Sequence, residues 1–388
     1  MIGRLFRRPR RRPRRPHGVN LVGYHGATSG LGDRVRELDR VLATAGIRYS
    51  RWDLEQTESG RRGPFGMAPV GAEDGAEDGI VFDTTIAVVT ALAFPGLDWS
   101  HRPLVREVDR VIGYWFWELE QVPGSHQPAI EMVDEIWAPT GFVRDAYGGV
   151  TERPVRVVAL PIVAPEVAGS GRAALALPPD HVVFLCSFDH LSSMERKHPI
   201  GVIEAFRRAF PSGDEPVHLV LKSINGDIRP QSAAKLTAAV GDDLRIELRD
   251  GYLSDPDQAA LIAAADVFVS LHRSEGLGLH VAEAMWLGTP VIATAYSGVL
   301  DLVDASCAEL VDGPLVPVGD GQEAYPADAL WADPDLDQAA AAMQRLADDP
   351  AHRVGLATAA RARIEPLGDR GAASARVAGL LSARPQRR

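Results

Sequence analysis

Short apolar runs alternate with amphipathic stretches along most of the chain. The run at residues 19–22, "VNLV", has the length of a buried strand, and residues 33–46, "DRVRELDRVLATAG", repeat apolar positions every three or four residues. This pattern predicts a strand followed by a helix that ends at Gly46. A glycine-rich turn, "GATSGLG" at residues 26–32, separates the two. Further strand-like runs at "IAVVTALAF", "RVIGYWFWELE" and "EIWAPT" extend the series, and such an alternation indicates parallel βαβ units.

A second series begins near residue 180. It contains the strand-like runs "HVVFLCSFD", "VHLVLKSING", "LRIELRDGYL" and "VFVSLHR" and the helical runs "PIGVIEAFRRAF" and "DPDQAALIAAAD". A proline- and glycine-rich stretch at 160–171, "LPIVAPEVAGSG", is the expected linker between the two series. The sequence therefore predicts an α/β protein with two Rossmann-like halves. The expected divisions are a basic tail (1–17), an N-terminal domain (18–165), a C-terminal domain (172–360) and a C-terminal helix returning towards the N-terminal domain with a basic end (361–388).

Composition fits this architecture and narrows the class of protein. A chain of 388 residues with 46% hydrophobic and 24% charged residues is ordinary for a globular protein of two domains. The longest apolar stretch, residues 80–97, contains Asp83 and Pro95, so we expect no membrane span and no signal peptide. Two cysteines without metal-ligand spacing favour a reduced, cytoplasmic protein.

Charge is distributed unevenly. The net charge is −11 for the chain and +8 for residues 1–16, which leaves −19 for the remainder. Eight arginines and no acid in that first segment indicate a solvated, disordered tail, or a peripheral contact with anionic lipid at the inner membrane face. The acidic remainder argues against a nucleic-acid partner. Residues 58–79 carry a duplicated "EDG" without periodicity and are expected to be a surface loop.

The stretch "SEGLGLHVAEAM", residues 274–285, has the order expected of a ligand site. A glycine turn with Gly276, Leu277 and Gly278 follows an apolar strand and opens a helix, so its backbone can approach an anion closely. Glu283 would lie in an early helical turn, where a carboxylate can accept two ribose hydroxyls, and Glu275 would face the other end of the same ligand. Both glutamates could equally serve only as partners of the helix dipole.

The longer segment "SEGLGLHVAEAMWLGTPVIAT" resembles the paired-glutamate signature of retaining glycosyltransferases of family 4, which have the GT-B fold. The resemblance implies two Rossmann-like domains with parallel sheets facing an interdomain cleft. It places Glu283 on the nucleotide ribose, Glu275 near the donor sugar, and the amides of Gly276 to Gly278 near the sugar or diphosphate. His280 stands where the family usually has proline, and we expect it to pack.

The segment "FLCSFDHLSSMERKHPIGVIEAFRRAF" resembles the first strand, loop and helix of the family's donor domain. Lys197 matches a lysine that neutralises the diphosphate leaving group. Many members also have an arginine soon after the strand, and here Phe188 and Asp189 occupy that place. Arg196 is the candidate to supply the missing charge. On the alternative interpretation, "ERK" is only a solvated helix start.

Three further segments complete the expected site. "GYHGATSGLGDRVREL" and "GYWFWELEQVP" resemble one branch of the same family, which implies that Gly30, Leu31 and Gly32 face the donor phosphates. Glu118 follows an aromatic run at the end of a strand and is the candidate for acceptor contact. "AYSGVLDLVD" resembles the loop after the paired glutamates, so Ser297 and Gly298 would bind the donor. The "DPD" motifs at Asp255 and Asp333 are expected to cap helices rather than to bind a metal.

The resemblance implies a metal-independent retaining hexosyltransferase, with Glu275, Lys197 and Glu118 as catalytic residues. The donor would be a nucleotide-sugar, GDP-mannose or a UDP-sugar, and no further cofactor is expected. The acceptor would be a glycan, a lipid-linked sugar or a small molecule, in polysaccharide or glycoconjugate biosynthesis. A sugar-nucleotide epimerase or phosphorylase of the same fold, and a non-catalytic binding subunit, are the alternatives.

Overall fold

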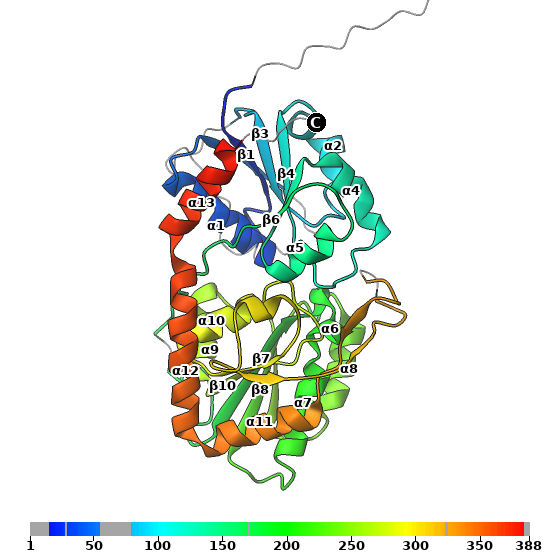
Figure 1. The fold of residues 1–388 in the computed structure, drawn as a ribbon. Coiled ribbons are helices and arrows are strands. Elements are labelled where there is room, and N and C mark those ends of the chain that lie inside the picture. The colour runs from blue at the N-terminus through cyan, green and yellow to red at the C-terminus, as the bar shows by residue number, and fades with distance from the viewer. Residues whose placement is uncertain (1–14, 28, 55–78, 170, 323–324, 384–388) are drawn as a thin grey trace, which may run out of the picture.

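The computed structural model describes residues 15–27, 29–54, 79–169, 171–322 and 325–383. In these ranges the chain forms two six-stranded sheets, one in each half, and every strand pair within them is parallel. The two halves lie one above the other in Figure 1, with the C-terminal helices running along one side of both. This arrangement is the two-domain, Rossmann-like GT-B fold. The expected surface loop, except for its last residue, and most of the basic tail lie outside the described residues.

The N-terminal sheet has the strand order β2-β1-β3-β4-β5-β6. Its strands are β1 (Val19–Gly23), β2 (Tyr49–Asp53), β3 (Thr84–Val88), β4 (Arg110–Tyr114), β5 (Glu135–Ala138) and β6 (Val155–Val157). Strands β1, β3 and β4 are buried over their whole length, because helices cover both faces of the sheet. One face packs on α1 (Gly30–Thr44), and the other on α2 (Gly96–Ser100), α3 (Arg102–Arg106), α4 (Gln127–Met132) and α5 (Gly141–Gly148).

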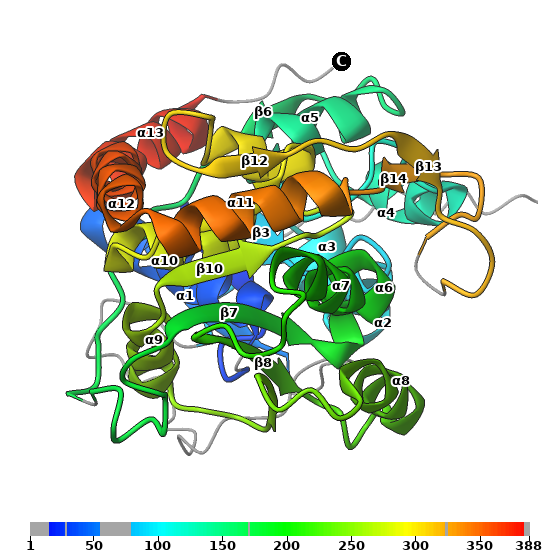
Figure 2. The same ribbon diagram turned by 90° about the horizontal axis from the view of Figure 1, so that it is seen from below.

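The C-terminal sheet has the order β12-β11-β10-β7-β8-β9. Its strands are β7 (Val182–Asp189), β8 (Val217–Ile224), β9 (Ile246–Asp250), β10 (Val267–Ser270), β11 (Val291–Thr294) and β12 (Glu309–Val311). Figure 2 shows the helices on its two faces. One face packs on α7 (Pro199–Ala209), α8 (Pro230–Val240) and α11 (Leu336–Asp348), and the other on α9 (Asp255–Ala264), α10 (Leu279–Leu287) and α12 (Pro350–Ile364). A short helix, α6 (Met194–Lys197), lies between β7 and α7.

The chain returns to the N-terminal domain at its end, where α13 (Arg370–Ser382) packs on α1 (Figure 1). Arg370 forms an ion pair with the buried Glu37 of α1 at 2.8 Å, and Ser374 donates a hydrogen bond to the carbonyl oxygen of Val41. In the linker between the domains, the carbonyl oxygen of Ile162 accepts a hydrogen bond from the indole of Trp286 in α10 at 2.6 Å. These contacts attach α13 to the N-terminal domain and α10 to the linker between the domains.

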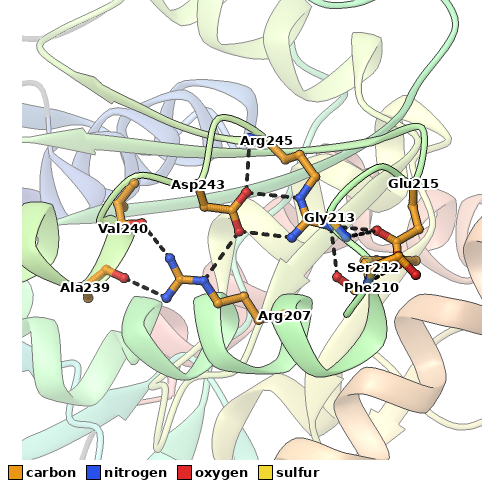
Figure 3. Close-up of polar contacts among 9 residues, drawn as sticks. All are labelled: Arg207, Phe210, Ser212, Gly213, Glu215, Ala239, Val240, Asp243 and Arg245. Atoms are coloured by element: carbon orange, nitrogen blue, oxygen red, sulfur yellow. Dashed lines mark hydrogen bonds and ion pairs between the residues drawn. The ribbon is translucent and has the colours of Figure 1, made fainter.

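A polar network in the C-terminal domain is centred on Asp243 and Arg245 (Figure 3). Arg245 makes a two-pronged contact with Asp243, with both N···O distances 3.0 Å, and also donates to Glu215 at 2.8 Å. Arg207 of α7 reaches the same Asp243 carboxylate at 3.4 Å and donates to the carbonyl oxygen of Ala239. The network joins the turns that precede β8 and β9, at the edge of the sheet opposite the carboxyl ends of its strands.

The structure corrects three local predictions. Helix α1 begins at Gly30, inside the glycine turn, because Ser29 caps it by accepting a hydrogen bond from the Gly32 amide. Strand β4 ends at Tyr114, so the rest of the aromatic run is loop, although Trp115 and Trp117 are buried. Neither Asp255 nor Asp333 is a helix cap. Ser254 caps α9, and Asp255 is the first residue of that helix. The cap of α11 is Asp335, the second aspartate of the motif at 333–335, while Asp333 pairs with Arg273 at 2.8 Å.

Candidate functional site

A cleft of about 2630 Å³ lies between the two domains, at the carboxyl ends of the strands of the C-terminal sheet. Its wall on the N-terminal side includes the start of α1 and the loop after β4. Its wall on the C-terminal side includes the end of β7 with α6, the end of β8, and the glutamate turn, residues 275–278. Most of the residues expected to bind or react line this one cleft: Gly30, Leu31, Glu118, Arg196, Lys197, Glu275, Gly276, Leu277, Gly278 and Glu283.

Glu275 is the centre of a buried charged cluster in this cleft. Its side chain accepts a hydrogen bond from Nζ of Lys197 and lies 3.2 Å from Nη1 of Arg196. Burial alone would raise the pKa of Glu275, but the charges of Lys197 and Arg196 outweigh it and hold that pKa well below its ordinary value. Glu275 is therefore ionised at neutral pH, although it is only 8% exposed. Both cations, Arg196 and Lys197, line the cleft, and Lys197 precedes Glu275 by 78 residues in the sequence.

The backbone geometry of α6 explains how both cations reach Glu275. Ser193 and His198 flank this four-residue helix with φ values of 62° and 54°, in the left-handed region that non-glycine residues rarely adopt. Ser193 caps the helix by accepting a hydrogen bond from the Arg196 amide at 3.3 Å. The Arg196 guanidinium also donates to the carbonyl oxygen of Ser274 at 2.8 Å. Arg196 is thus a buried, bonded part of the cleft wall and not a solvated side chain.

The glutamate turn brings the backbone of one domain against that of the other. A Cβ placed on Gly276 would lie 3.0 Å from the carbonyl oxygen of Trp117, so a side chain here would strain the interdomain contact. Thr140 of the N-terminal domain donates to the carbonyl oxygen of Gly276 at 2.9 Å. Gly278 precedes α10 with a φ of 88° and offers no side-chain cap to the first amides of that helix. The start of α10 is therefore suited to an anionic ligand.

Ser297 and Gly298 lie behind the glutamate turn and do not line the cleft. The Ser297 hydroxyl accepts a hydrogen bond from the Glu275 amide at 2.8 Å, and the Gly298 amide donates to the Glu275 carbonyl oxygen at 2.9 Å. A Cβ on Gly298 would approach the Gly276 carbonyl oxygen to 2.2 Å. The structure gives these two residues a supporting position behind Glu275 instead of the expected place on the donor wall.

The two glycines of the first turn also have different surroundings. Gly30 lines the cleft, and a Cβ there would lie 3.5 Å from the side chain of Leu279 at the start of α10. Gly32 does not line the cleft. A Cβ on it would come within 2.2 Å of the carbonyl oxygen of Ala27, so this glycine is needed for packing. The starts of α1 and α10 face each other across the cleft, which adds a second helix N-terminus to the site.

Glu283 has an unusual electrostatic environment. Within the described part of the chain, its carboxylate makes no hydrogen bond or ion pair to another residue. Burial and the nearby carboxylate of Asp33 raise the pKa of Glu283 to about 8; Arg34 opposes this shift and Asp255 adds to it. The side chain is therefore largely protonated at neutral pH and faces a cleft in which none of the described residues bonds to it. This arrangement differs from a simple helix-dipole role, which needs the charged form.

Glu118 is held from two segments of the C-terminal domain. Its carboxylate accepts a hydrogen bond from the Tyr325 hydroxyl at 3.2 Å, and its backbone carbonyl accepts one from the Ser274 hydroxyl. The side chain is half-buried at the wall of the cleft. Glu118, the fourth residue after β4, thus lies in the same cleft as Glu275 but belongs to the opposite domain.

Sequence reasoning missed two residues of the cleft wall. Lys222, near the carboxyl end of β8, is buried, and burial lowers the pKa of its amine to about 8 despite the opposing effect of Asp250. A charged residue at the end of an apolar strand was the available signal. Tyr325 lies in a stretch without periodicity, so no pattern pointed to it. His280 both lines the cleft and packs edge-on against Phe268, at 6.4 Å between ring centroids.

Residues 179–349 match the family described as glycosyl transferases group 1. Over 113 residues, 29% of this chain, the sequence is 37% identical to a D-inositol 3-phosphate glycosyltransferase of Pseudarthrobacter chlorophenolicus. The matched segment spans only 22% of the length of that protein.

Solved structures resemble most of the chain. HepE of Anabaena, solved with UDP and glucose, is 15% identical with a TM-score of 0.65, and the match covers 94% of this chain and 100% of that one. Sucrose-phosphate synthase of Thermosynechococcus elongatus is 18% identical with the same TM-score, covering 95% and 98%. TarM of S. aureus has a TM-score of 0.57 at 12% identity over 77% of this chain, which spans about half, 55%, of TarM. At these identities the likeness establishes the GT-B fold alone.

None of the described helices is long and apolar enough to cross a membrane. Among the same residues, no group of three or more histidine, cysteine, aspartate or glutamate side chains is arranged to hold a metal ion. Both cysteines, Cys186 and Cys307, are buried free thiols.

Proposed function

We propose that this protein is a retaining glycosyltransferase that moves a hexosyl unit from a nucleotide-sugar to a hydroxyl acceptor. The observation that carries the proposal is the cluster of Glu275, Lys197 and Arg196 beside the glutamate turn, at the start of α10. A group 1 glycosyltransferase match over residues 179–349 supports the reaction class. The donor is GDP-mannose or a UDP-sugar, and the two HepE structures, solved with UDP and glucose or with UDP-glucose, favour the second.

The cations of the cluster suit a diphosphate leaving group. Lys197 and Arg196 place two positive charges at the wall of the cleft. The start of α10, which has no side-chain cap, adds the positive end of its helix dipole. Stabilising negative charge that develops in the transition state typically accounts for a factor of 10²–10³ per donor, by about 3–4 kcal/mol. In this role Lys197 exchanges Glu275 for a phosphate oxygen when the donor binds.

Glu275 and Glu283 would then bind opposite ends of the donor. Glu275, which its two cationic neighbours keep ionised in the free protein and which retains Arg196 when Lys197 turns to the phosphate, accepts hydroxyls of the donor sugar. Glu283 accepts the hydroxyls of the ribose, which supply the hydrogen-bond partners that the described protein does not. A front-face displacement, in which the leaving phosphate takes the acceptor proton, retains the anomeric configuration without a protein nucleophile.

The acceptor would enter from the N-terminal side, beside Glu118. A glycan, a lipid-linked sugar or a small polyol all fit a cleft of this size, and we place the reaction in polysaccharide or glycoconjugate biosynthesis at or near the cytoplasmic membrane face. The arginine-rich segment 1–16 is the proposed lipid contact. Binding to vesicles containing anionic lipid should be lost when that segment is deleted, and equal binding by the truncated chain would refute the contact.

The first test measures thermal stability with UDP, GDP, ADP, TDP and CMP, for the wild type and for Glu283→Ala. A nucleotide present at 100 times its Kd stabilises the fold by about 2.7 kcal/mol, which raises the melting temperature visibly. We expect one nucleotide to produce this shift and Glu283→Ala to abolish it. No shift with any nucleotide would contradict the proposal and favour a binding subunit.

A second test separates transfer from epimerisation. The identified donor is incubated with and without an acceptor panel, and the products are examined by NMR. Transfer with α-to-α or β-to-β outcome supports a retaining transferase. A changed sugar in the absence of acceptor would instead identify a sugar-nucleotide epimerase.

A further inference from the structure

The segment between β12 and α11, described for residues 312–322 and 325–335, interrupts the alternation of strands and helices and is called the insertion. It reaches across to the N-terminal domain. After β12 the chain forms an antiparallel hairpin from β13 (Leu315–Pro317) and β14 (Leu330–Ala332) before it enters α11. Figure 2 shows the hairpin, labelled β13 and β14, on the same side of the molecule as α4. Val318, Ala329 and Trp331 of the insertion belong to the same hydrophobic cluster as the core of the N-terminal domain. The insertion is therefore packed as part of both domains.

The insertion places one side chain on the acceptor side of the cleft. The ring of Tyr325 packs against Trp117 at 5.5 Å and Trp331 at 6.4 Å between centroids. Its hydroxyl donates to the carboxylate of Glu118 at 3.2 Å, and Tyr325 itself lines the cleft. Two aromatic contacts thus aim a single hydroxyl at the carboxylate proposed to meet the acceptor.

The same insertion touches the segment that carries the cations. Ser193, the cap of α6, donates a hydrogen bond from its hydroxyl to the side-chain oxygen of Gln322 at 3.0 Å. Gln322 also lines the cleft. One insertion is therefore connected both to Glu118 and to the helix that holds Arg196 and Lys197, so it couples the acceptor wall to the leaving-group wall.

We propose that Tyr325 is a positioning residue for the acceptor: it fixes the Glu118 carboxylate in the orientation that receives the acceptor hydroxyl, and the acceptor site is complete only with this residue of the opposite domain. The inference rests on the proposed function. If the inference holds, the insertion takes part in selecting the acceptor, through the hydrogen bond from Tyr325 to Glu118.

The test compares Tyr325→Phe with a matched control, Tyr296→Phe. Tyr296 also donates from one domain to a glutamate of the other, Glu120, at 3.2 Å, but it does not line the cleft. Tyr325→Phe keeps the ring and removes only the hydroxyl. We expect it to lower kcat/KM for the acceptor about tenfold, the usual effect of losing a hydrogen bond to a charged group, with the donor KM unchanged. Tyr296→Phe should behave as the wild type.

A double-mutant cycle with Glu118→Ala shows whether Tyr325 acts through the glutamate. In the Glu118→Ala background, Tyr325→Phe should change the acceptor kcat/KM less than twofold, because the group that it positions is gone. Full additivity, an effect on the donor KM alone, or wild-type kinetics in Tyr325→Phe would each overturn the inference and leave the proposed function intact. Failure of the proposed function appears earlier and separately, as a wild type that transfers from no donor, and the inference would fall with it.

Discussion

Glu283 should release its proton when the nucleotide binds. In the free protein, burial and Asp33 raise its pKa to about 8, so about nine in ten molecules carry the proton at pH 7. A protonated carboxyl can donate one hydrogen bond, whereas accepting both ribose hydroxyls uses the ionised form. If the bound ribose restores the pKa of Glu283 towards its ordinary value of 4.5, binding at pH 7 releases close to one proton.

The magnitude follows from the distance between the pH and the free-state pKa. Each pKa unit corresponds to about 1.4 kcal/mol, so the nucleotide Kd should tighten about tenfold between pH 7 and pH 9 and then level off. Lys222 lines the same cleft, and its pKa of about 8 would act in the opposite direction if it binds phosphate. The matched variant Glu283→Gln keeps Lys222 and cannot titrate at residue 283. The difference between the two proteins therefore isolates Glu283.

Isothermal titration calorimetry in two buffers of different ionisation enthalpy counts the protons directly. At pH 7 the wild type should release nearly one proton more per nucleotide than Glu283→Gln, and the gap should vanish by pH 9.5. The free Glu283→Gln protein should also melt several degrees higher than the wild type at pH 8. At that pH Glu283 ionises freely in the unfolded wild type, whereas the folded wild type holds its pKa near 8, and this difference favours unfolding. Equal proton release by both proteins at pH 7 would refute the assignment of Glu283 to the ribose.

Three further predictions concern the cation cluster, its support and the polar network of Figure 3. Lys197→Ala should lower kcat by about 10²–10³ with intact folding, measured by single-turnover transfer, because a leaving-group cation is lost; a change in KM alone would contradict this role. Gly298→Ala should destabilise the fold by about 1–3 kcal/mol and lower kcat by displacing the glutamate turn, since its Cβ would meet a backbone oxygen at 2.2 Å. Gly148→Ala, where a Cβ would meet nothing within 4 Å, is the control, and equal urea midpoints for the two variants would show that the turn tolerates the change. Asp243→Asn should cost about 1–2 kcal/mol at neutral pH by weakening the contact with Arg245. Hydrogen bonding to Arg245 lowers the pKa of Asp243, so the difference from wild type should be full above the ordinary value of 3.8 and should shrink as the pH falls through the lowered one. A pH-independent difference in urea unfolding would contradict an electrostatic cause.

The order of elements and the main chemical features of the cleft could be predicted from the sequence. Apolar runs of strand length, separated by helical periodicity, are sufficient for two parallel sheets, because strands buried on both faces require continuous apolar residues. The glycine turn between β10 and α10 is also local information. Its geometry needs residues without a Cβ, and parallel sheets bring such turns to the carboxyl edge. For this reason Glu275, Glu283 and Lys197 could be expected in one cleft.

Only the tertiary structure decided which side chains face each other across that cleft. Ser297 and Gly298 follow the next strand and were expected on the donor wall, but the folded loop places them behind Glu275. Burial in the cleft and the nearby Asp33, a residue of the other domain, raise the pKa of Glu283, and the contact of Glu118 depends on Tyr325, 207 residues later. Local propensity determines the type and order of the elements, although the exact start of α1 and the end of β4 differ from the pattern. Which residue lies beside a buried carboxylate depends on how the two domains pack against each other. The pattern of apolar residues within one domain contains no information about that packing.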